Sequence, residues 1–249
     1  MKIDRHFIHL TSTISTNTDL KARIAAADGP VYDVLFADRQ TGGRGRLGRA
    51  FFSPPGGLYA SVPLPLTGEE TEIPCLTLLA GLCVCTALED LCGVTPRIKW
   101  PNDLYLNGKK LCGILCELVS GRTPTAVVGI GVNLNARPAE FPAELKEKMT
   151  SLRAEGVTPP PPKVLIKAVA ERLDRAVYED RALADKTALA GFLGQIRERS
   201  FLDGKTVGRS VNGGTVSGTF RGIADNGAAL LQLPDGTTRT VVSGEITVE

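Results

Sequence analysis

Five short segments of alternating apolar and polar residues, separated by tight-turn dipeptides, make up the C-terminal end of the chain. The dipeptides are Asn212-Gly213, Asn226-Gly227, Asp235-Gly236 and Ser243-Gly244, which favour the turns that join antiparallel strands. The segments are residues 206–211, 215–223, 228–233, 237–242 and 246–248. Five strands this short indicate a small β-barrel. About 45 residues bury too little apolar surface to be very stable alone, so we expect the barrel to pack on a larger domain.

The larger part of the chain combines helical and strand patterns. Helices are expected at residues 16–28 and 74–92 and, after residue 162, in two segments where apolar residues recur every three or four positions. Strands are expected at residues 31–37, 58–64, 97–100, 104–106, 110–118 and 125–134. Asn107-Gly108 is a strong hairpin signal between two of these strands. The order predicts an antiparallel meander and not a series of β-α-β units.

The domain organisation follows from these elements. Four consecutive prolines at residues 159–162 predict a linker that cannot be helical. Gly129 and Gly131, inside a predicted strand, indicate that something approaches the backbone closely. We predict an α+β fold, with a mixed, mainly antiparallel sheet and helices in residues 1–200 and the small barrel in residues 201–249.

Histidine is scarce in this chain of 249 residues, in which only His6 and His9 occur. A Ser-His-Asp triad, a Cys-His dyad or a zinc site with several histidines would have to use the extreme N-terminus. The formal net charge is +2, so the composition shows no strong electrostatic signature for bulk nucleic acid or a membrane surface. Any chemistry is expected to depend on Lys, Arg, Asp, Asn and backbone groups.

The six cysteines indicate buried, reduced thiols, because none forms a C-x-x-C pair and four lie in the apolar run at residues 74–93. The N-terminus lacks the apolar core of a signal peptide. The most apolar run, residues 73–88, contains a proline and is shorter than the ~18 residues that a membrane span requires. We therefore expect a cytoplasmic protein without a membrane segment.

A loop rich in glycine and arginine, residues 40–49, follows the strand predicted at residues 31–37. Residues 43–48 match the G-x-G-x-x-G pattern, but a dinucleotide site requires a helix directly after the loop, and residues 51–57 (FFSPPGG) would break one. Three interpretations remain: a solvated surface loop, an RNA-binding Arg-Gly segment, or a mobile loop whose arginines bind phosphate or carboxylate. The arginines concerned are Arg44, Arg46 and Arg49.

Five motifs occur in a fixed order along the chain. They are Ser15-Thr16-Asn17, QTGGRGRLGR at residues 40–49, KWPNDL at 99–104, KLCGIL at 110–115 and GIGVNLN at 129–135. Together they resemble the biotin protein ligase family. GRGR and KWPND are specific, whereas the STN and GxGxN segments would be weak alone. The resemblance covers nearly the whole chain, including the predicted barrel.

Membership in this family implies a catalytic domain related to class II aminoacyl-tRNA synthetases, followed by an SH3-like barrel. It implies an ATP-dependent ligase that joins biotin to ATP as biotinyl-5′-AMP and then transfers the biotinyl group to one lysine of a biotin carboxyl carrier protein. Only 14 residues precede Ser15, too few for the DNA-binding domain of some members. We therefore expect the monofunctional form, with no DNA or membrane partner; a homodimer is compatible with the family.

The resemblance also implies residue roles. Lys110 would bridge the biotin carboxylate and the α-phosphate, Arg46 would close over the phosphates, and Asp103 would hold Mg²⁺ or orient the incoming lysine amine. The residues implied for biotin are Ser15, Thr16, Asn17, Gln40, Gly43, Arg44, Gly45, Arg46, Lys110 and Gly113. Those implied for ATP or the adenylate are Arg44, Arg46, Arg49, Trp100, Asn102, Lys110 and Asn133.

Alternatives remain at the level of function and of single residues. A lipoate/octanoate protein ligase would require a long apolar tunnel, and a biotin-responsive DNA regulator would require a DNA-binding domain. A binding module that uses only the barrel would leave the glycine-arginine loop unexplained. Lys110 could be an exposed hairpin lysine, and Trp100, the only tryptophan, could pack in the core instead of stacking on adenine.

Overall fold

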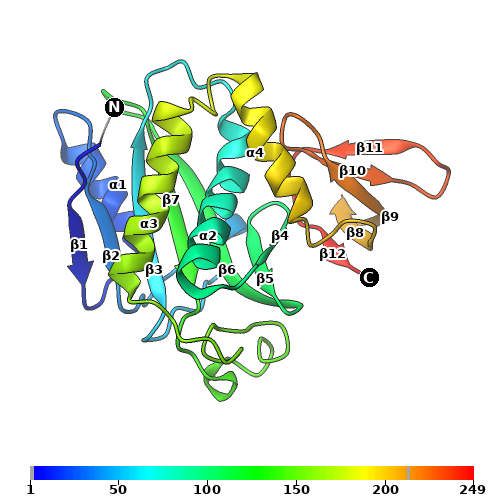
Figure 1. Cartoon of the computed structure of the whole chain (residues 1–249), viewed down its shortest axis with the longest axis horizontal. Helices are drawn as coiled ribbons and strands as arrows, with labels where there is room; N and C mark the ends of the chain where they lie inside the picture. The colour runs from blue at the N-terminus through cyan, green and yellow to red at the C-terminus, as the bar shows by residue number, and fades with distance from the viewer. Residues whose placement is uncertain (1–2, 212–213) are drawn as a thin grey trace.

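A seven-stranded sheet organises the larger domain of the protein in this computed structural model, which describes residues 3–211 and 214–249. The strand order is β1-β2-β3-β7-β6-β5-β4, and all neighbours are antiparallel except the parallel pair β1 and β2 (Figure 1). The strands are β1 (Phe7–Leu10), β2 (Val34–Ala37), β3 (Leu58–Pro65), β4 (Arg97–Lys99), β5 (Asp103–Leu106), β6 (Lys109–Val119) and β7 (Thr125–Val132).

The start of the chain differs from the sequence prediction. No strand was expected before residue 16, yet β1 precedes helix α1 (Thr16–Ala26) and pairs in parallel with β2. The antiparallel meander expected for the strands at residues 97–134 is confirmed in β4-β5-β6-β7, whereas this β-α-β unit at the start of the chain was not predicted. β1 has only four residues, none of them fully buried, so its sequence shows too few alternations to be recognised.

Alternate residues of the central strands serve two apolar layers. Leu35 and Val127 point toward α1, where they pack with Leu20 and Ile24. The opposite face, which is covered by the remaining helices, carries Val34 and Phe36 of β2 and the alternate residues of β7: Ala126, Val128, Ile130 and Val132. The two-residue period of the strands thus explains why both faces of the sheet are buried.

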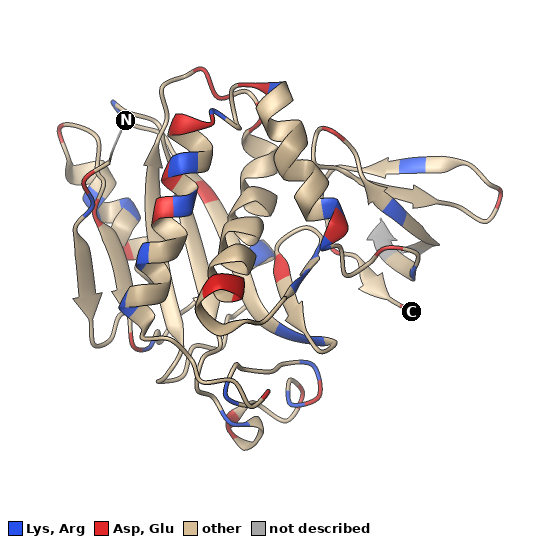
Figure 2. Ribbon diagram, in the orientation of Figure 1, with Lys and Arg blue, Asp and Glu red and all other residues tan. Residues whose placement is uncertain are grey.

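Three helices cover the second face and stand together in front of the sheet in Figure 1. They are α2 (Leu76–Cys92), α3 (Pro162–Asp174) and α4 (Lys186–Glu198). α2 ends at Gly93, whose left-handed φ of 68° lets its N–H bond to the carbonyl oxygen of Glu89. Charged positions gather on α3 and the loops, and few occur in the central strands (Figure 2).

The apolar helix expected at residues 74–92 is present as a 3-10 turn followed by α2. Pro74 lies in a 3-10 turn (Ile73–Cys75) that leads into α2. Proline is tolerated there because a backbone N–H at the start of a helix has no partner within the helix. By length and composition alone, the combined helix of 20 residues could cross a membrane. However, 67% of its apolar window is buried inside the fold, between the sheet and the helices α3 and α4, as in the core helix of a globular domain.

Pro162 is likewise helical, which corrects the prediction that residues 159–162 are wholly non-helical. α3 begins at Pro162, after Pro161 as its N-cap. The first helical position tolerates proline because its N–H would have no helical partner, and the fixed φ of proline suits the helix.

The C-terminal end forms a five-stranded antiparallel sheet, in the order β11-β10-β9-β8-β12. Its strands are β8 (Thr206–Val211), β9 (Gly214–Ile223), β10 (Ala229–Gln232), β11 (Thr238–Val241) and β12 (Thr247–Val248), so the five predicted strands are confirmed. The predicted Asn212-Gly213 turn lies outside the described residues. Phe201 N donates to Ile98 O on the edge strand β4, so the chain is paired to the larger sheet just before the barrel. The division at residues 200 and 201 stays a prediction.

Candidate active site

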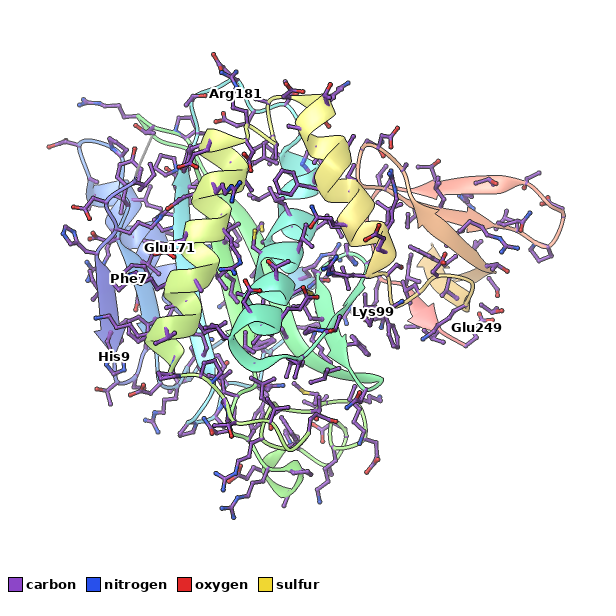
Figure 3. The ribbon with its side chains drawn as sticks, in the orientation of Figure 1. Phe7, His9, Lys99, Glu171, Arg181 and Glu249 are labelled. Atoms are coloured by element: carbon purple, nitrogen blue, oxygen red, sulfur yellow. The ribbon has the colours of Figure 1, made fainter. Side chains whose placement is uncertain are left out.

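A cavity of about 850 Å³ lies between one end of the large sheet and the C-terminal barrel. Its wall combines the start of α1, the glycine-arginine loop, the β5–β6 hairpin, the glycines of β7 and residues 244–248 of the barrel. Lys99, on this wall, lies at the junction of the two sheets, whereas His9 lies at the opposite side of the molecule (Figure 3). The site therefore has no histidine among its described lining residues, as the sequence indicated.

Most of the residues that the resemblance implied border this one cavity, although they come from segments far apart in the chain. They are Ser15, Thr16, Asn17, Gln40, Arg44, Gly45, Arg46, Arg49, Trp100, Asn102, Asp103, Lys110 and Gly113. Two others, Gly43 and Asn133, do not border it.

One end of the cavity is polar but mostly uncharged. Gln40 Oε1 accepts from the backbone N–H of Thr16 at 2.9 Å, and Gln40 Nε2 donates to Ser53 Oγ at 3.0 Å. Ser61 Oγ lies 2.8 Å from Thr16 Oγ1 and donates to Asn17 Oδ1 at 2.5 Å. These hydroxyl and amide groups offer donors and acceptors without net charge, which suits a neutral polar ligand.

The glycines of β6 and β7 make room for two side chains. A Cβ on Gly129 would lie 2.4 Å from Asn17 Oδ1, and a Cβ on Gly131 would lie 2.4 Å from the ring of Phe51. The ring of Phe51 also lies 2.8 Å from the place of a Cβ on Gly113. The prediction that something approaches this backbone closely is therefore confirmed, and the approaching groups are side chains of the cavity wall.

Lys110 and Asp103 form the charged centre of the cavity. Lys110 Nζ lies 2.7 Å from Asp103 Oδ1, and both side chains are partly buried, with 26% and 20% exposed. The backbone of Lys110 is fixed by hydrogen bonds to Lys148 O and from Thr150 N. The interpretation of Lys110 as an exposed hairpin lysine is therefore wrong; its neighbour Lys109 makes only a long, exposed contact with Glu147.

The glycine-arginine loop is tied to the barrel. Arg46 donates to Gly244 O at 3.1 Å and to Asn102 Oδ1 at 3.4 Å. Arg49 forms a two-point ion pair with Glu245. A short 3-10 turn (Arg46–Gly48) and an extended segment follow the first glycines of the loop. The prediction that no α-helix begins directly after the loop is therefore confirmed.

The surroundings of the two arginines act on their pKa values in opposite directions. Burial lowers the pKa of Arg46, although the carboxylates of Asp103 and Glu245 counteract it. The hydrogen bonds that Arg49 donates to the Glu245 carboxylate raise the pKa of Arg49. Both guanidinium groups are permanent cations at neutral pH, as phosphate binding requires.

Trp100 packs in the core, as one of the two interpretations of the sequence expected, and its stacking on adenine stays a prediction. Its side chain is 3% exposed and packs in the main core, where Nε1 donates to Gly227 O of the barrel at 2.9 Å. It also borders the cavity. Next to it, Asn102 Nδ2 donates to Ile114 O at 3.0 Å, which fixes the end of the amide that faces Arg46.

Gly43 and Asn133 support the cavity from behind. A Cβ on Gly43 would lie 2.7 Å from Ser53 Oγ and 2.8 Å from Gln40 Nε2, so glycine lets the loop pack on these polar groups. Asn133 is buried, and its Nδ2 donates to Thr150 O at 2.9 Å. Direct roles of both residues in ligand binding stay predictions.

Several residues of the site were missed in the sequence. A weak signal existed for Ser61, a polar residue within the otherwise apolar strand LYASVPLP, and for Phe51, which follows the loop directly. No local signal marked Glu117, whose carboxylate accepts from Asn17 and Lys21, or Glu245, because their partners lie about 100 and 196 positions away.

The donor set offers little to a metal ion by itself. Within residues 3–211 and 214–249, no group of three or more His, Cys, Asp or Glu side chains could hold one. Asp103 is paired with Lys110, and Glu245 with Arg49. Mg²⁺ is commonly held by one or two carboxylates together with the phosphates of a nucleotide, so these residues fit the ion only in company with such a ligand.

Sequence comparison assigns the chain to a family over most of its length. The biotin/lipoate A/B protein ligase family profile matches residues 10–135, and the profile of the biotin protein ligase C-terminal domain matches residues 206–248. The chain belongs to the biotin protein ligase family. The second match favours a biotin ligase over a lipoate ligase.

Individual biotin protein ligases resemble the chain from end to end. The biotin–(acetyl-CoA-carboxylase) ligase of Mycobacterium tuberculosis is 34% identical over 95% of this chain and 86% of its own length. The bifunctional ligase/repressor BirA of Bacillus subtilis is 33% identical over 93% of this chain and 71% of its own length. The biotin protein ligase of Aquifex aeolicus in complex with biotin and ATP superposes with a TM-score of 0.82, at 31% identity and 98% coverage of both chains. The predicted α+β fold with an SH3-like C-terminal barrel is therefore confirmed.

Proposed function

We propose that the protein is a biotin–(biotin carboxyl carrier protein) ligase, which activates biotin with ATP and transfers it to a lysine. The observation that carries the proposal is one continuous cavity with a neutral polar end and a cationic centre. Biotin has the same two halves: a neutral ureido ring, and a carboxylate that must meet a phosphate.

The neutral end would bind the ureido ring. That ring presents two N–H donors and one carbonyl acceptor, which call for hydrogen-bonding groups without net charge. Ser15, Thr16, Asn17 and Gln40 supply such groups at this end of the cavity. The backbone of Gly45 and Gly113 would line the path to the charged centre.

The cationic centre would promote adenylate formation. A carboxylate oxygen of biotin attacks the α-phosphorus of ATP, the bond to the β-phosphate breaks, and pyrophosphate leaves. Both reactants are anions, so fixed positive charges lower the barrier. Lys110 would bridge the carboxylate and the α-phosphate, and Arg44, Arg46 and Arg49 would neutralise the phosphates.

Mg²⁺ would enter the cavity with ATP. Asp103 and the nucleotide phosphates form the oxygen set that this ion prefers. When bound, the ion would withdraw negative charge from the leaving pyrophosphate. Asn102 and Trp100 border the same part of the cavity and would contact the nucleotide, with Asn133 behind them.

The second step would transfer the biotinyl group. The free amine of the acceptor lysine attacks the carbonyl carbon of the mixed anhydride, AMP leaves, and the amine loses a proton. Asp103 lies at the centre of the cavity and would orient this amine, the second role predicted for it. Closure of the glycine-arginine loop would keep water from the reactive anhydride.

The acceptor would be the carrier domain of a biotin-dependent carboxylase, which we expect to dock on an exposed strand edge. If the carrier is still recognised after backbone pairing at that edge has been disrupted, this mode of docking is wrong. Homodimerisation stays a prediction. We place the protein in the reducing cytoplasm, because its six cysteines are free thiols and four of them are buried.

The decisive experiment offers the purified protein biotin, lipoate or octanoate together with ATP and Mg²⁺. We expect pyrophosphate release with biotin, and mass spectrometry of a biotin carboxyl carrier domain should show one added biotinyl group. Faster release with lipoate or octanoate would favour the lipoate/octanoate ligase instead.

A further inference from the structure

A chain of hydrogen bonds supports the neutral end of the cavity from behind and ends at an ion pair. Asn17, which borders the cavity, donates through Nδ2 to Glu117 Oε2 at 2.8 Å. Lys21 Nζ donates to the other carboxylate oxygen, Glu117 Oε1, at 2.6 Å. Glu117 comes from β6 and lies outside the cavity wall, so its hydrogen-bonded connection to a ligand runs through Asn17.

The carboxylate determines which end of the Asn17 amide faces the cavity. An ionised carboxylate only accepts hydrogen bonds, so the amide nitrogen must face Glu117. Burial opposes ionisation of Glu117, but the hydrogen bonds from Lys21 and Asn17 outweigh it and hold its pKa below the ordinary value. With the amide reversed, Oδ1 would meet the Glu117 carboxylate and the carbonyl oxygen of Leu115, and the hydrogen bonds that Nδ2 donates to these two oxygens would be lost.

The neighbouring strand holds the amide oxygen in place. Asn17 Oδ1 can only accept, so Ser61 must direct its single hydroxyl proton to it, at 2.5 Å. Ser61 Oγ also lies 2.8 Å from Thr16 Oγ1, whose own hydroxyl donates to Gln40 Oε1 at 3.2 Å. The Asn17 amide also packs closely on the backbone of Gly129, because a Cβ at this position would lie 2.4 Å from Asn17 Oδ1.

We propose that Glu117 is a positioning residue for biotin, whose carboxylate orients the Asn17 amide so that Oδ1 offers its remaining lone pair to a ureido N–H. Lys21 holds the carboxylate in place. This inference rests on the proposed function and extends it to the residue that sets the direction of the hydrogen bonds in the biotin site.

The first test is the isosteric variant Glu117→Gln in the full chain. We expect the KM for biotin to rise about tenfold, in the range measured for hydrogen bonds to charged groups. The KM for ATP and kcat should stay within about twofold, since the charged centre is intact. An unchanged KM for biotin, or an equal rise of the KM for both substrates, would overturn the proposal.

Glu89→Gln is the matched control for this variant. Glu89 pairs with Arg199 at 3.0 Å, and its side chain is 22% exposed against 32% for Glu117. It lies on α2, outside the cavity wall. Its loss should leave the KM for biotin unchanged. A rise as large as that of Glu117→Gln would point to a general effect of losing a partly buried ion pair and would also overturn the proposal.

The second test exchanges the two groups of the pair. Asn17→Asp alone places two carboxylates together, and we expect kcat/KM for biotin to fall more than about 100-fold. Adding Glu117→Gln restores a pair of one carboxylate and one amide, now with the carboxylate at position 17 and the amide at position 117. An oxygen of the side chain at position 17 can then still accept a hydrogen bond from the cavity. The double variant should recover to within about tenfold of wild type, and a double variant no better than Asn17→Asp would contradict the proposal.

The two tests separate this inference from the proposed function. If the unaltered protein releases no pyrophosphate with biotin, the proposed function fails. If it turns over biotin normally and Glu117→Gln has the KM of wild type, only the positioning role fails. Thermal unfolding of each variant shows that the protein compared is folded.

Discussion

Arg49 of the glycine-arginine loop forms a two-point ion pair with Glu245 of the barrel, 196 positions later in the chain. Three residues before it, Arg46 donates to the carbonyl oxygen of Gly244. The loop proposed to bind phosphate is therefore held by the C-terminal domain. Phosphate and the Glu245 carboxylate are both anions that pair with a guanidinium, so they compete for Arg49.

Glu245→Gln should lower the KM for ATP, because the competing carboxylate is removed and Arg49 is free for phosphate. Both side chains are about half exposed, so the effect should be small, about two- to fivefold. The measurement is the KM for ATP from pyrophosphate release. Glu69→Gln, which removes another exposed pair, with Arg181, is the control and should change nothing. A higher KM for ATP in Glu245→Gln would mean that Glu245 positions Arg49 for phosphate.

Lys110→Ala should abolish adenylate formation while the protein stays folded. The ammonium group lies 2.7 Å from Asp103, and its loss removes the cation placed at the reacting carboxylate and phosphate. We expect pyrophosphate release to fall by at least about a hundred- to a thousandfold. Circular dichroism and thermal unfolding would verify the fold, and normal turnover in this variant would disprove the central assignment.

Arg46→Gly should make the protein release its adenylate. The variant loses the hydrogen bonds to Gly244 and Asn102 that tie the loop across the cavity. Escaped biotinyl-5′-AMP acylates exposed lysines without selectivity, so biotin should appear on an unrelated bystander protein in the reaction. Mass spectrometry of an equimolar mixture of carrier and bystander measures this. Labelling that remained restricted to the carrier would show that the loop does not act as a lid.

Gly131→Ala should destabilise the protein and weaken ligand binding. The new Cβ would lie 2.4 Å from a carbon of the Phe51 ring, which also packs on Gly113 and therefore has little room to move. We expect a loss of about 1–3 kcal/mol in the free energy of unfolding, measured in urea. Gly29→Ala, where the new Cβ meets nothing within 4 Å, is the control. Phe51→Leu in the Gly131→Ala background should recover part of the loss; no recovery would exclude the ring as the cause.

Glu117 should stabilise the fold in a way that depends on pH. Its pKa in the folded protein is lowered from the ordinary value of 4.5, so its contribution is complete above that value and is lost as the pH falls through the folded pKa. The difference in free energy of unfolding between wild type and Glu117→Gln should be constant from neutral pH to about pH 5.5 and should shrink below pH 4.5. Urea unfolding at a series of pH values measures it, and a difference that grew on acidification would have the wrong sign.

The barrel strands could be predicted because their signals are local. Dipeptides such as Asn226-Gly227 and Asp235-Gly236 specify tight turns from two adjacent residues, and the glycines adopt the positive φ that these turns require. β1 could not be predicted for the opposite reason. Its four residues are strand only because β2, more than twenty residues later, pairs with them.

The motifs of the site could be recognised, but the contacts of their side chains could not. Ser61 reaches Asn17 because β3 pairs with β7 in the register that places Ser61 opposite Gly129. The pairing of β6 with β7 places Leu115 opposite the same Gly129, and Glu117 stands two residues further along β6. A shift of one residue in either register would turn these side chains to the other face of the sheet.

By itself, the sequence determined the turns, the helical and strand periods, the shortage of histidine and the motifs that mark the family, because each depends on neighbouring residues or on composition. Only the tertiary structure decided that Lys110 faces Asp103, that Glu117 supports Asn17, and that the barrel holds the loop through Glu245. These contacts join segments separated by up to 196 residues. Their geometry depends on strand register and domain packing, which no local pattern specifies.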